Sequence, residues 1–140
     1  MALDVSRALG KSDGAALAAF HMRAASILTH AEHSSALARP VTALRRALTA
    51  LASLDYSTLP QAAARDLSLS LARTYIGALM VEQAAVSEHQ GDALVAEDWC
   101  SSRELVPVVG RAERGEYSEH RTEGQRLLVY HMYDPEETFH

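Results

Sequence analysis

The sequence contains a single cysteine, Cys100, and therefore cannot form a disulfide within the chain. Such sparing use of cysteine is typical of proteins from a reducing compartment. The chain also has no run of eighteen uncharged apolar residues, so we expect no membrane-spanning helix. The N-terminus shows no basic leader followed by an apolar core. We therefore expect a cytoplasmic protein with no membrane partner.

Positive charge is not in excess in this chain. Its 13 Lys and Arg residues are outnumbered by 18 Asp and Glu residues, which gives a formal net charge of −5. Residues 1–90 are close to neutral, and residues 91–140 carry most of the acidic excess. A nucleic-acid backbone attracts a basic protein face. The composition therefore argues against a nucleic-acid partner.

Several common catalytic motifs are also missing. The sequence has neither of the Gly-rich phosphate loops, G-x-x-x-x-G-K and G-x-G-x-x-G, and no G-x-S-x-G nucleophile turn. Cys100 has no His or Asn motif near it that would activate a thiol. We expect Cys100 to be a buried or half-buried thiol, and we expect no autonomous catalysis of these kinds.

Alanine and leucine dominate the hydrophobic residues, which make up 48% of the chain, whereas aromatic residues make up only 6%. This composition favours helix over sheet. Apolar residues recur at spacings of three and four, with Gly or Pro between the repeats. The pattern predicts helices over residues 15–37, 41–54, 67–86 and 93–105. We expect an all-α, up-and-down bundle of four or five helices within residues 1–110, followed by an acidic C-terminal extension, 111–140, packed on the bundle or trailing from it.

The segment LSLSLARTYIGALMVEQAAV, residues 67–86, is predicted to be the central helix of the bundle. Its polar positions fall within a stripe about 60° wide: Asp66, Ser70, Arg73, Gly77 and Glu88. The rest of the circumference is almost entirely apolar. We expect the polar stripe to face water, Leu71 and Ile76 to be deeply buried, and Gly91 to provide a left-handed C-cap.

Three residues are candidates for chemistry within the predicted helices. Glu82 projects from the apolar side of the central helix, so it either has a hydrogen-bond partner, such as Tyr or Arg, or takes part in acid–base chemistry. His30 and His33 are spaced i, i+3 and could bind one metal ion together. The repeated Glu-x-x-His pairs of two-metal carboxylate bundles are missing, so we favour a solvated histidine face and predict no metal site.

Three segments have the composition and order of an Ala/Leu-rich helical bundle followed by a helix that continues into an L-V-P-V segment. They are AFHMRAASILTHAEH (19–33), LSLSLARTYIGALMVEQAA (67–85) and AEDWCSSRELVPVV (96–109). Together they resemble the C-terminal helical domain of acyl-CoA dehydrogenases and the related oxidases. That family's flavin-contacting Arg-Phe-Gly and its glycine-rich C-terminal segment are absent, so the resemblance assigns no catalytic or FAD-binding residue. It implies a helical domain or subunit of a flavoprotein, which packs on catalytic domains or sister subunits. Any FAD or acyl-thioester site that it lines would be shared with another domain or chain.

Apolar residues are numerous in the last predicted helix and just after it: Leu94, Val95, Trp99, Val106, Val108 and Val109. A free-standing domain of this size would leave some of them uncovered. A contiguous exposed apolar patch usually marks an interface. We therefore expect a homo-oligomer or a partner subunit, with Trp99 at or near the contact.

A second motif suggests a function of a different class. Arg126, His131 and Tyr133 follow the spacing Arg, four residues, His, one residue, Tyr. This resembles the motif of the HEPN ribonuclease-toxin family, in which Arg and His flank the scissile phosphate and Tyr accompanies them. An endoribonuclease that uses Arg126 and His131 is therefore an alternative function. A helical interaction module without catalytic activity is a third.

The ribonuclease alternative makes a direct prediction. If His131 is catalytic, the folded wild-type chain cuts RNA without added metal, and His131→Ala abolishes the cleavage. A gel assay with labelled single-stranded RNA measures both. An inert wild-type protein, shown by circular dichroism to be folded at the assay concentration, excludes this function.

Overall fold

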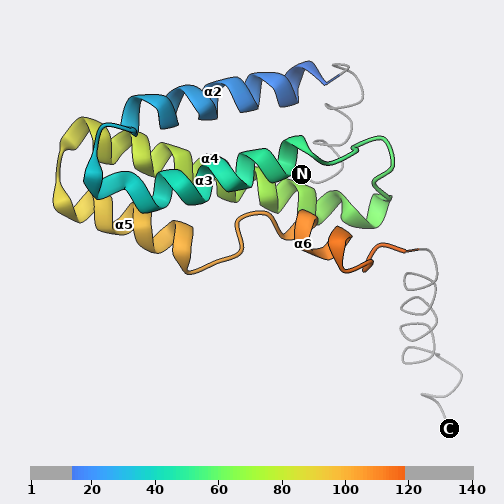
Figure 1. The fold of residues 1–140 in the computed structure, drawn as a ribbon. Helices are drawn as coiled ribbons and strands as arrows, with labels where there is room; N and C mark the ends of the chain where they lie inside the picture. The colour runs from blue at the N-terminus through green and yellow to red at the C-terminus, as the bar shows by residue number, and fades with distance from the viewer. Residues whose placement is uncertain (1–13, 119–140) are drawn as a thin grey trace, which may run out of the picture.

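The computed structural model describes residues 14–118, which form an all-α bundle (Figure 1). Four helices run alternately up and down, and a short fifth helix follows: α2 (Ala15–Ala31), α3 (Ala38–Ala52), α4 (Ala64–Ser87), α5 (Gln90–Ser101) and α6 (Pro107–Glu113). The 3₁₀ turns η1 (Ser35–Leu37) and η2 (Gln61–Ala63) precede α3 and α4. Of the described residues 77% are helical and none is in a strand. The predicted all-α, up-and-down bundle is confirmed.

Helix α4 is the central element of this bundle, as predicted. It packs against α2, α3, α5 and α6, whereas each of the other helices packs closely on fewer neighbours. The main core lies among α2, α3, α4 and α5 and includes Leu28, Leu44, Val81 and Cys100. A second cluster, which includes Leu51, Leu67 and Val108, lies beneath α6.

The orientation predicted for α4 is wrong. Its buried face carries mostly small or polar side chains at helical spacing: Asp66, Ser70, Thr74, Gly77, Ala78, Val81 and Ala84. Ile76 and Leu79 are each 39% exposed, and Val86 is 78% exposed. Leu71 is only half-buried. Much of the polar stripe that was expected to face water thus faces the core, and part of the apolar surface of α4 faces outward.

Local hydrogen bonding explains why polar residues can occupy the buried face of α4. The Ser70 hydroxyl donates to the Asp66 carbonyl at 2.6 Å, and the Ser68 hydroxyl donates to the Ala64 carbonyl at 3.0 Å. Serine hydroxyls satisfied by their own helix cost little to bury. Small side chains also let neighbouring helices approach closely, which favours this face for packing.

Two helices approach α4 closely at Gly77. A Cβ atom there would lie 2.8 Å from Leu44 Cδ2 and 3.3 Å from both Cys100 Sγ and Trp99 Cδ1. Leu44 is itself buried, so its side chain has no free space to move into. The absence of a side chain at Gly77 therefore allows α3 and α5 to pack directly on α4.

Two predicted helix ends also differ from the structure. The left-handed C-cap of α4 is Glu88, with φ 54°, and Gly91 lies inside α5. The helix predicted over residues 93–105 ends at Ser101, and Pro107 begins α6, where a missing backbone N–H costs nothing. Helix α6 runs through Gly110 and so crosses the boundary predicted between bundle and extension.

A polar network fastens α6 and the residues after it to α4. The Asp66 carboxylate, which is almost fully buried, accepts hydrogen bonds from Arg111 Nη1 at 3.0 Å and from the Tyr117 hydroxyl. The Ser70 hydroxyl accepts the backbone N–H of Val108 at 3.1 Å. Burial and the hydrogen bond to Asp66 raise the pKa of Tyr117 above its ordinary value. The network therefore keeps the Tyr117 phenol protonated as a donor.

Gly77→Ala should destabilise the bundle. Ala favours helix over Gly, so we compare it with Gly91→Ala in α5, where a Cβ would meet only His89 Nδ1, at 3.9 Å. We expect the Gly77 variant to be less stable than the Gly91 variant by about 1–3 kcal/mol, the usual cost of overpacking. Urea denaturation followed by circular dichroism measures the difference. Equal midpoints would show that α3 and α5 can move away without cost.

Tyr117→Phe should weaken the attachment of α6. It removes one donor to a nearly buried carboxylate, and we expect a loss of about 1–2 kcal/mol in the free energy of unfolding. Tyr75→Phe is the matched control, because no hydrogen bond of the Tyr75 hydroxyl is found among the described residues. Urea denaturation of both variants tests this. A Tyr117 variant as stable as the control contradicts the role assigned to the network.

Candidate functional site

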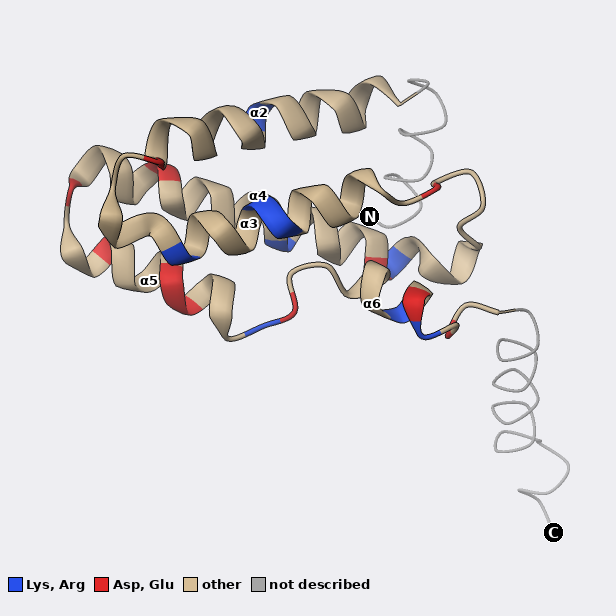
Figure 2. Cartoon of the chain, viewed as in Figure 1, with Lys and Arg blue, Asp and Glu red and all other residues tan. Residues whose placement is uncertain are grey.

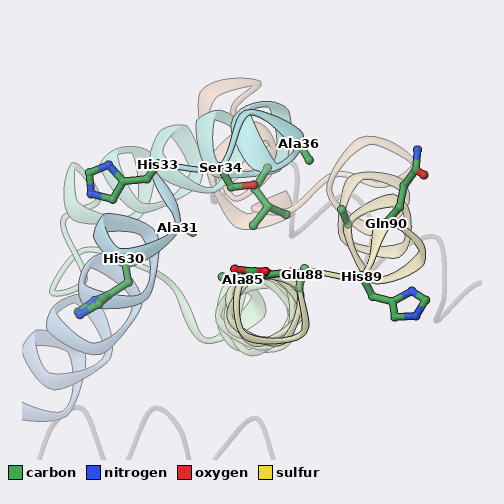
Figure 3. A pocket seen from close by; sticks show the side chains of 12 residues that line it. His30, Ala31, His33, Ser34, Ala36, Ala85, Glu88, His89 and Gln90 are labelled. Atoms are coloured by element: carbon green, nitrogen blue, oxygen red, sulfur yellow. The ribbon is translucent and has the colours of Figure 1, made fainter.

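A hollow of about 560 Å³ lies at the end of the bundle where α2 and α4 end and α5 begins (Figure 3). We refer to it as the end hollow. Its apolar wall is made mostly of alanine: Ala31, Ala36, Leu37, Ala84, Ala85 and Ala93. Its polar lining comprises His30, His33, Ser34, Glu88, His89 and Gln90. The end hollow is thus formed by residues from α2, η1, α4, α5 and the turns between them.

Glu88 is the polar residue of the end hollow that carries a full negative charge. Its side chain lies over the end of α4, while the rings of His30, His33 and His89 point away from it (Figure 3). Its left-handed backbone conformation is uncommon for a residue other than glycine. Sequence reasoning missed this site, because Glu88 was assigned only to a solvated stripe.

The two histidines predicted as weak metal candidates do not converge on a shared site in Figure 3. His30 Nδ1 lies 2.8 Å from the Ser26 carbonyl oxygen of its own helix. Within residues 14–118 no three His, Cys, Asp or Glu side chains are grouped so that they could hold a metal ion. The i, i+3 spacing therefore brings His30 and His33 to one end of the bundle without a third ligand.

Glu82 has the arginine partner that was one of its two predicted alternatives. Arg23 Nη2 on α2 donates to Glu82 Oε2 at 2.8 Å, and the two side chains are 50% and 38% exposed. An ion pair this exposed stabilises a protein only modestly. The pair links α2 to α4.

Trp99 lies half-buried in the seam between α4 and α5. Its indole N–H donates to the Arg73 carbonyl at 3.0 Å, and the Arg103 guanidinium lies 3.6 Å from the centre of its ring. The neighbouring Cys100 is buried, as predicted, and burial raises its pKa to about 11. Cys100 is therefore a packing residue, whereas the predicted role of Trp99 at an interface stays a prediction.

Helices α4 and α5 carry several large exposed apolar side chains: Ile76, Leu79, Val86, Leu94 and Val95. Of these, Ile76, Leu79 and Val95 line one groove between the two helices, and we call the surface around this groove the apolar face. This mostly apolar groove of about 250 Å³ is lined by Ile76, Leu79, Met80, Gln83, Asp92 and Val95. Of the apolar residues predicted to be in surplus, Leu94 and Val95 are exposed, whereas Val108 lies on the buried side of α6.

Charged residues are scattered over the helices in the view of Figure 2. Several arginines pair with carboxylates on other helices or turns: Arg23 with Glu82, Arg39 with Glu97, Arg45 with Glu32 and Arg111 with Asp66. None of the helices in residues 14–118 is long and apolar enough to cross a membrane. Arg126, His131 and Tyr133 lie outside the described residues, so the ribonuclease motif stays a prediction.

The end hollow does not fit the pyrophosphate of a flavin cofactor. Protein sites hold the FAD pyrophosphate with backbone N–H groups of glycine-rich turns or with basic side chains. The end hollow instead presents the Glu88 carboxylate, and the guanidinium nearest to it in the adjoining α2–α4 cleft, Arg23, is paired with Glu82. We therefore assign no residue of this chain to flavin binding.

Comparison with known protein families identifies a match over most of the chain. The model of a family described as acyl-CoA dehydrogenase 11 C-terminal domain-like matches residues 15–130. The matched range begins at the first residue of α2 and includes α3, α4, α5 and α6. Comparison with curated proteins and with solved structures gives no significant match.

Proposed function

Because the chain belongs to the acyl-CoA dehydrogenase 11 C-terminal domain-like family, we propose that it is a helical domain or subunit of an acyl-CoA dehydrogenase-like flavoprotein. Its role is packing and assembly, in the cytoplasm, through the apolar face. A sister copy or the catalytic domains of the flavoprotein cover this face. FAD and the acyl thioester are held mainly by those other domains, and this chain at most lines their site.

The exposure of the apolar face is the observation that carries this proposal. Ile76, Leu79 and Val95 are 39%, 39% and 56% exposed, and the groove that they line offers little polar surface. Full burial of one such side chain contributes about 1.5–3 kcal/mol. Association itself costs about 4–15 kcal/mol. Burial of one side chain does not offset this cost, so a partner must bury several side chains of the apolar face at once. Their position along adjacent stretches of α4 and α5 permits this.

The ion pairs support a packing role over a catalytic one. Arg23–Glu82 joins α2 to α4, Arg39–Glu97 joins α3 to α5, and Arg111–Asp66 joins α6 to α4. Each pair links two helices and adds modestly to the stability of the bundle. Together with the apolar core, the pairs hold the helices in place, so the apolar face is presented with little rearrangement, which lowers the entropic cost of docking.

Trp99 is suited to report this assembly. It lies one helical turn from Val95 on α5, at one end of the seam that forms the groove. A partner seated over the groove would change the solvent exposure of the half-buried indole. We therefore retain the prediction that Trp99 is at or near the contact.

The assembly prediction is tested by light scattering on the purified 140-residue chain. We expect a mass of at least twice 15.2 kDa, or a heteromer that is yellow if the second polypeptide holds a flavin. Val95→Asp should reduce the mass to that of the monomer, because it places a charge in the apolar groove. Thr49→Asp, at an exposed position of α3, is the control and should leave the mass unchanged.

Two outcomes contradict the proposal. One is a wild-type chain that stays monomeric at high micromolar concentration and purifies without a second polypeptide. The other is an assembly that Val95→Asp leaves intact while Trp99 emission does not change on dilution.

A further inference from the structure

We propose that the end hollow binds an aliphatic cation, that is, an ammonium or guanidinium group on a short alkyl chain, with Glu88 as its charged acceptor. The inference concerns a different surface from the apolar face and does not depend on the assembly role.

The shape and lining of the end hollow suit an alkyl chain. Its volume of about 560 Å³ lies within the range of small-molecule pockets in proteins, roughly 300–1,000 Å³. Ala31, Ala84 and Ala93 form the buried part of the wall, together with Leu37. Their methyl groups leave the space open and give an apolar surface for methylene groups to contact.

Glu88 gives the end hollow its charge preference. It is the only carboxylate among the lining residues, and no hydrogen bond or ion pair of its side chain is found within the described part of the chain. The other two acidic residues at this end are engaged: Glu32 pairs with Arg45, and Asp92 accepts a hydrogen bond from the Ser87 hydroxyl at 2.6 Å. A cation in the hollow would therefore meet an unpaired carboxylate, and an anion would be repelled.

The helix ends reinforce this preference on the α4 side. Helices α2 and α4 run in the same direction, and both end at the hollow (Figure 1). Their last carbonyl groups lack partners within the helix and carry partial negative charge. Helix α5 and turn η1 begin nearby, so their N-terminal N–H groups partly offset the effect. Glu88 then makes the end hollow negative, because its carboxylate carries a full charge and lies toward the middle of the hollow (Figure 3).

Histidine side chains flank the hollow without closing it. The rings of His30, His33 and His89 point away from Glu88, so they neither pair with its carboxylate nor occupy the space beside it (Figure 3). The cation has two possible sources with the same chemistry. One is a Lys or Arg side chain of a partner protein, and the other is a free alkylamine.

The test is a titration of the full chain with n-butylammonium at pH 8 and low salt, followed by NMR of alanine methyl groups. We expect saturable shifts at Ala31, Ala84 and Ala93, with n-butanol binding at least fivefold more weakly because it lacks the charge. Glu88→Gln should weaken butylammonium binding at least fivefold. Asp98→Asn, at another exposed acidic residue, is the matched control and should leave the affinity unchanged.

A second variant tests the space in the end hollow separately from the charge of Glu88. Ala36→Leu narrows the hollow at an exposed position of η1 and should also weaken binding without unfolding the bundle. Equal binding of butanol and butylammonium, unchanged affinity of Glu88→Gln, or no saturable shift at the three alanines would each overturn the proposal.

A short alanine peptide with one central lysine distinguishes the two sources. If the peptide shifts the same methyl groups and its acetyl-lysine form does not, the hollow accepts a protein side chain. If only free butylammonium does so, it accepts a small amine. Either result supports the cation site. If neither butylammonium nor the lysine peptide binds, the proposal is refuted.

Discussion

The close contact at Gly77 determines how the bundle is arranged. Leu44, Trp99 and Cys100 all approach the position that a side chain at Gly77 would occupy, so α3 and α5 both pack directly on α4 there. Helices this close can be accommodated only by a face of small residues, and Ser70, Thr74, Gly77, Ala78 and Ala84 provide one. The larger side chains of α4 must then lie elsewhere on its circumference. The exposure of Ile76, Leu79 and Val86 is thus a consequence of close packing on the opposite side.

The same constraint explains what could be predicted from the sequence and what could not. The number and order of the helices follow from the spacing of apolar residues and from the Gly and Pro residues between the helices, which are local signals. The orientation of α4 depends on contacts far apart in sequence. Asp66 can be buried because Arg111 and Tyr117 reach it from 45 and 51 residues away. A rule that places polar residues outside therefore failed at Asp66, whose side-chain partners helical periodicity cannot indicate. It also failed at Ser70, which donates to the Asp66 carbonyl of its own helix and accepts the Val108 N–H from α6.

The candidate sites also divide into those that the sequence indicated and one that it could not indicate. The sequence identified Glu82 as unusual and offered an arginine as its partner, and Arg23 is that partner. It also placed apolar surplus at Leu94 and Val95, which are exposed. The end hollow could not be predicted, because its alanines come from four elements and each alanine alone is unremarkable in an Ala-rich chain. The sequence likewise does not indicate the left-handed conformation of Glu88, the carboxylate that lines the space they leave.

Helix α4 connects these features because it is a single rod of 24 residues, about 36 Å long. Its first turns are bonded to α6 through Asp66, its middle is in close contact with α3 and α5 at Gly77, and its last residue leads into Glu88. A shift of α4 along its axis would disturb all three. A change at an exposed residue such as Val95 or Glu88 would alter only the surface to which it belongs. The apolar face and the end hollow can therefore be examined independently, whereas any change at Gly77 acts on both.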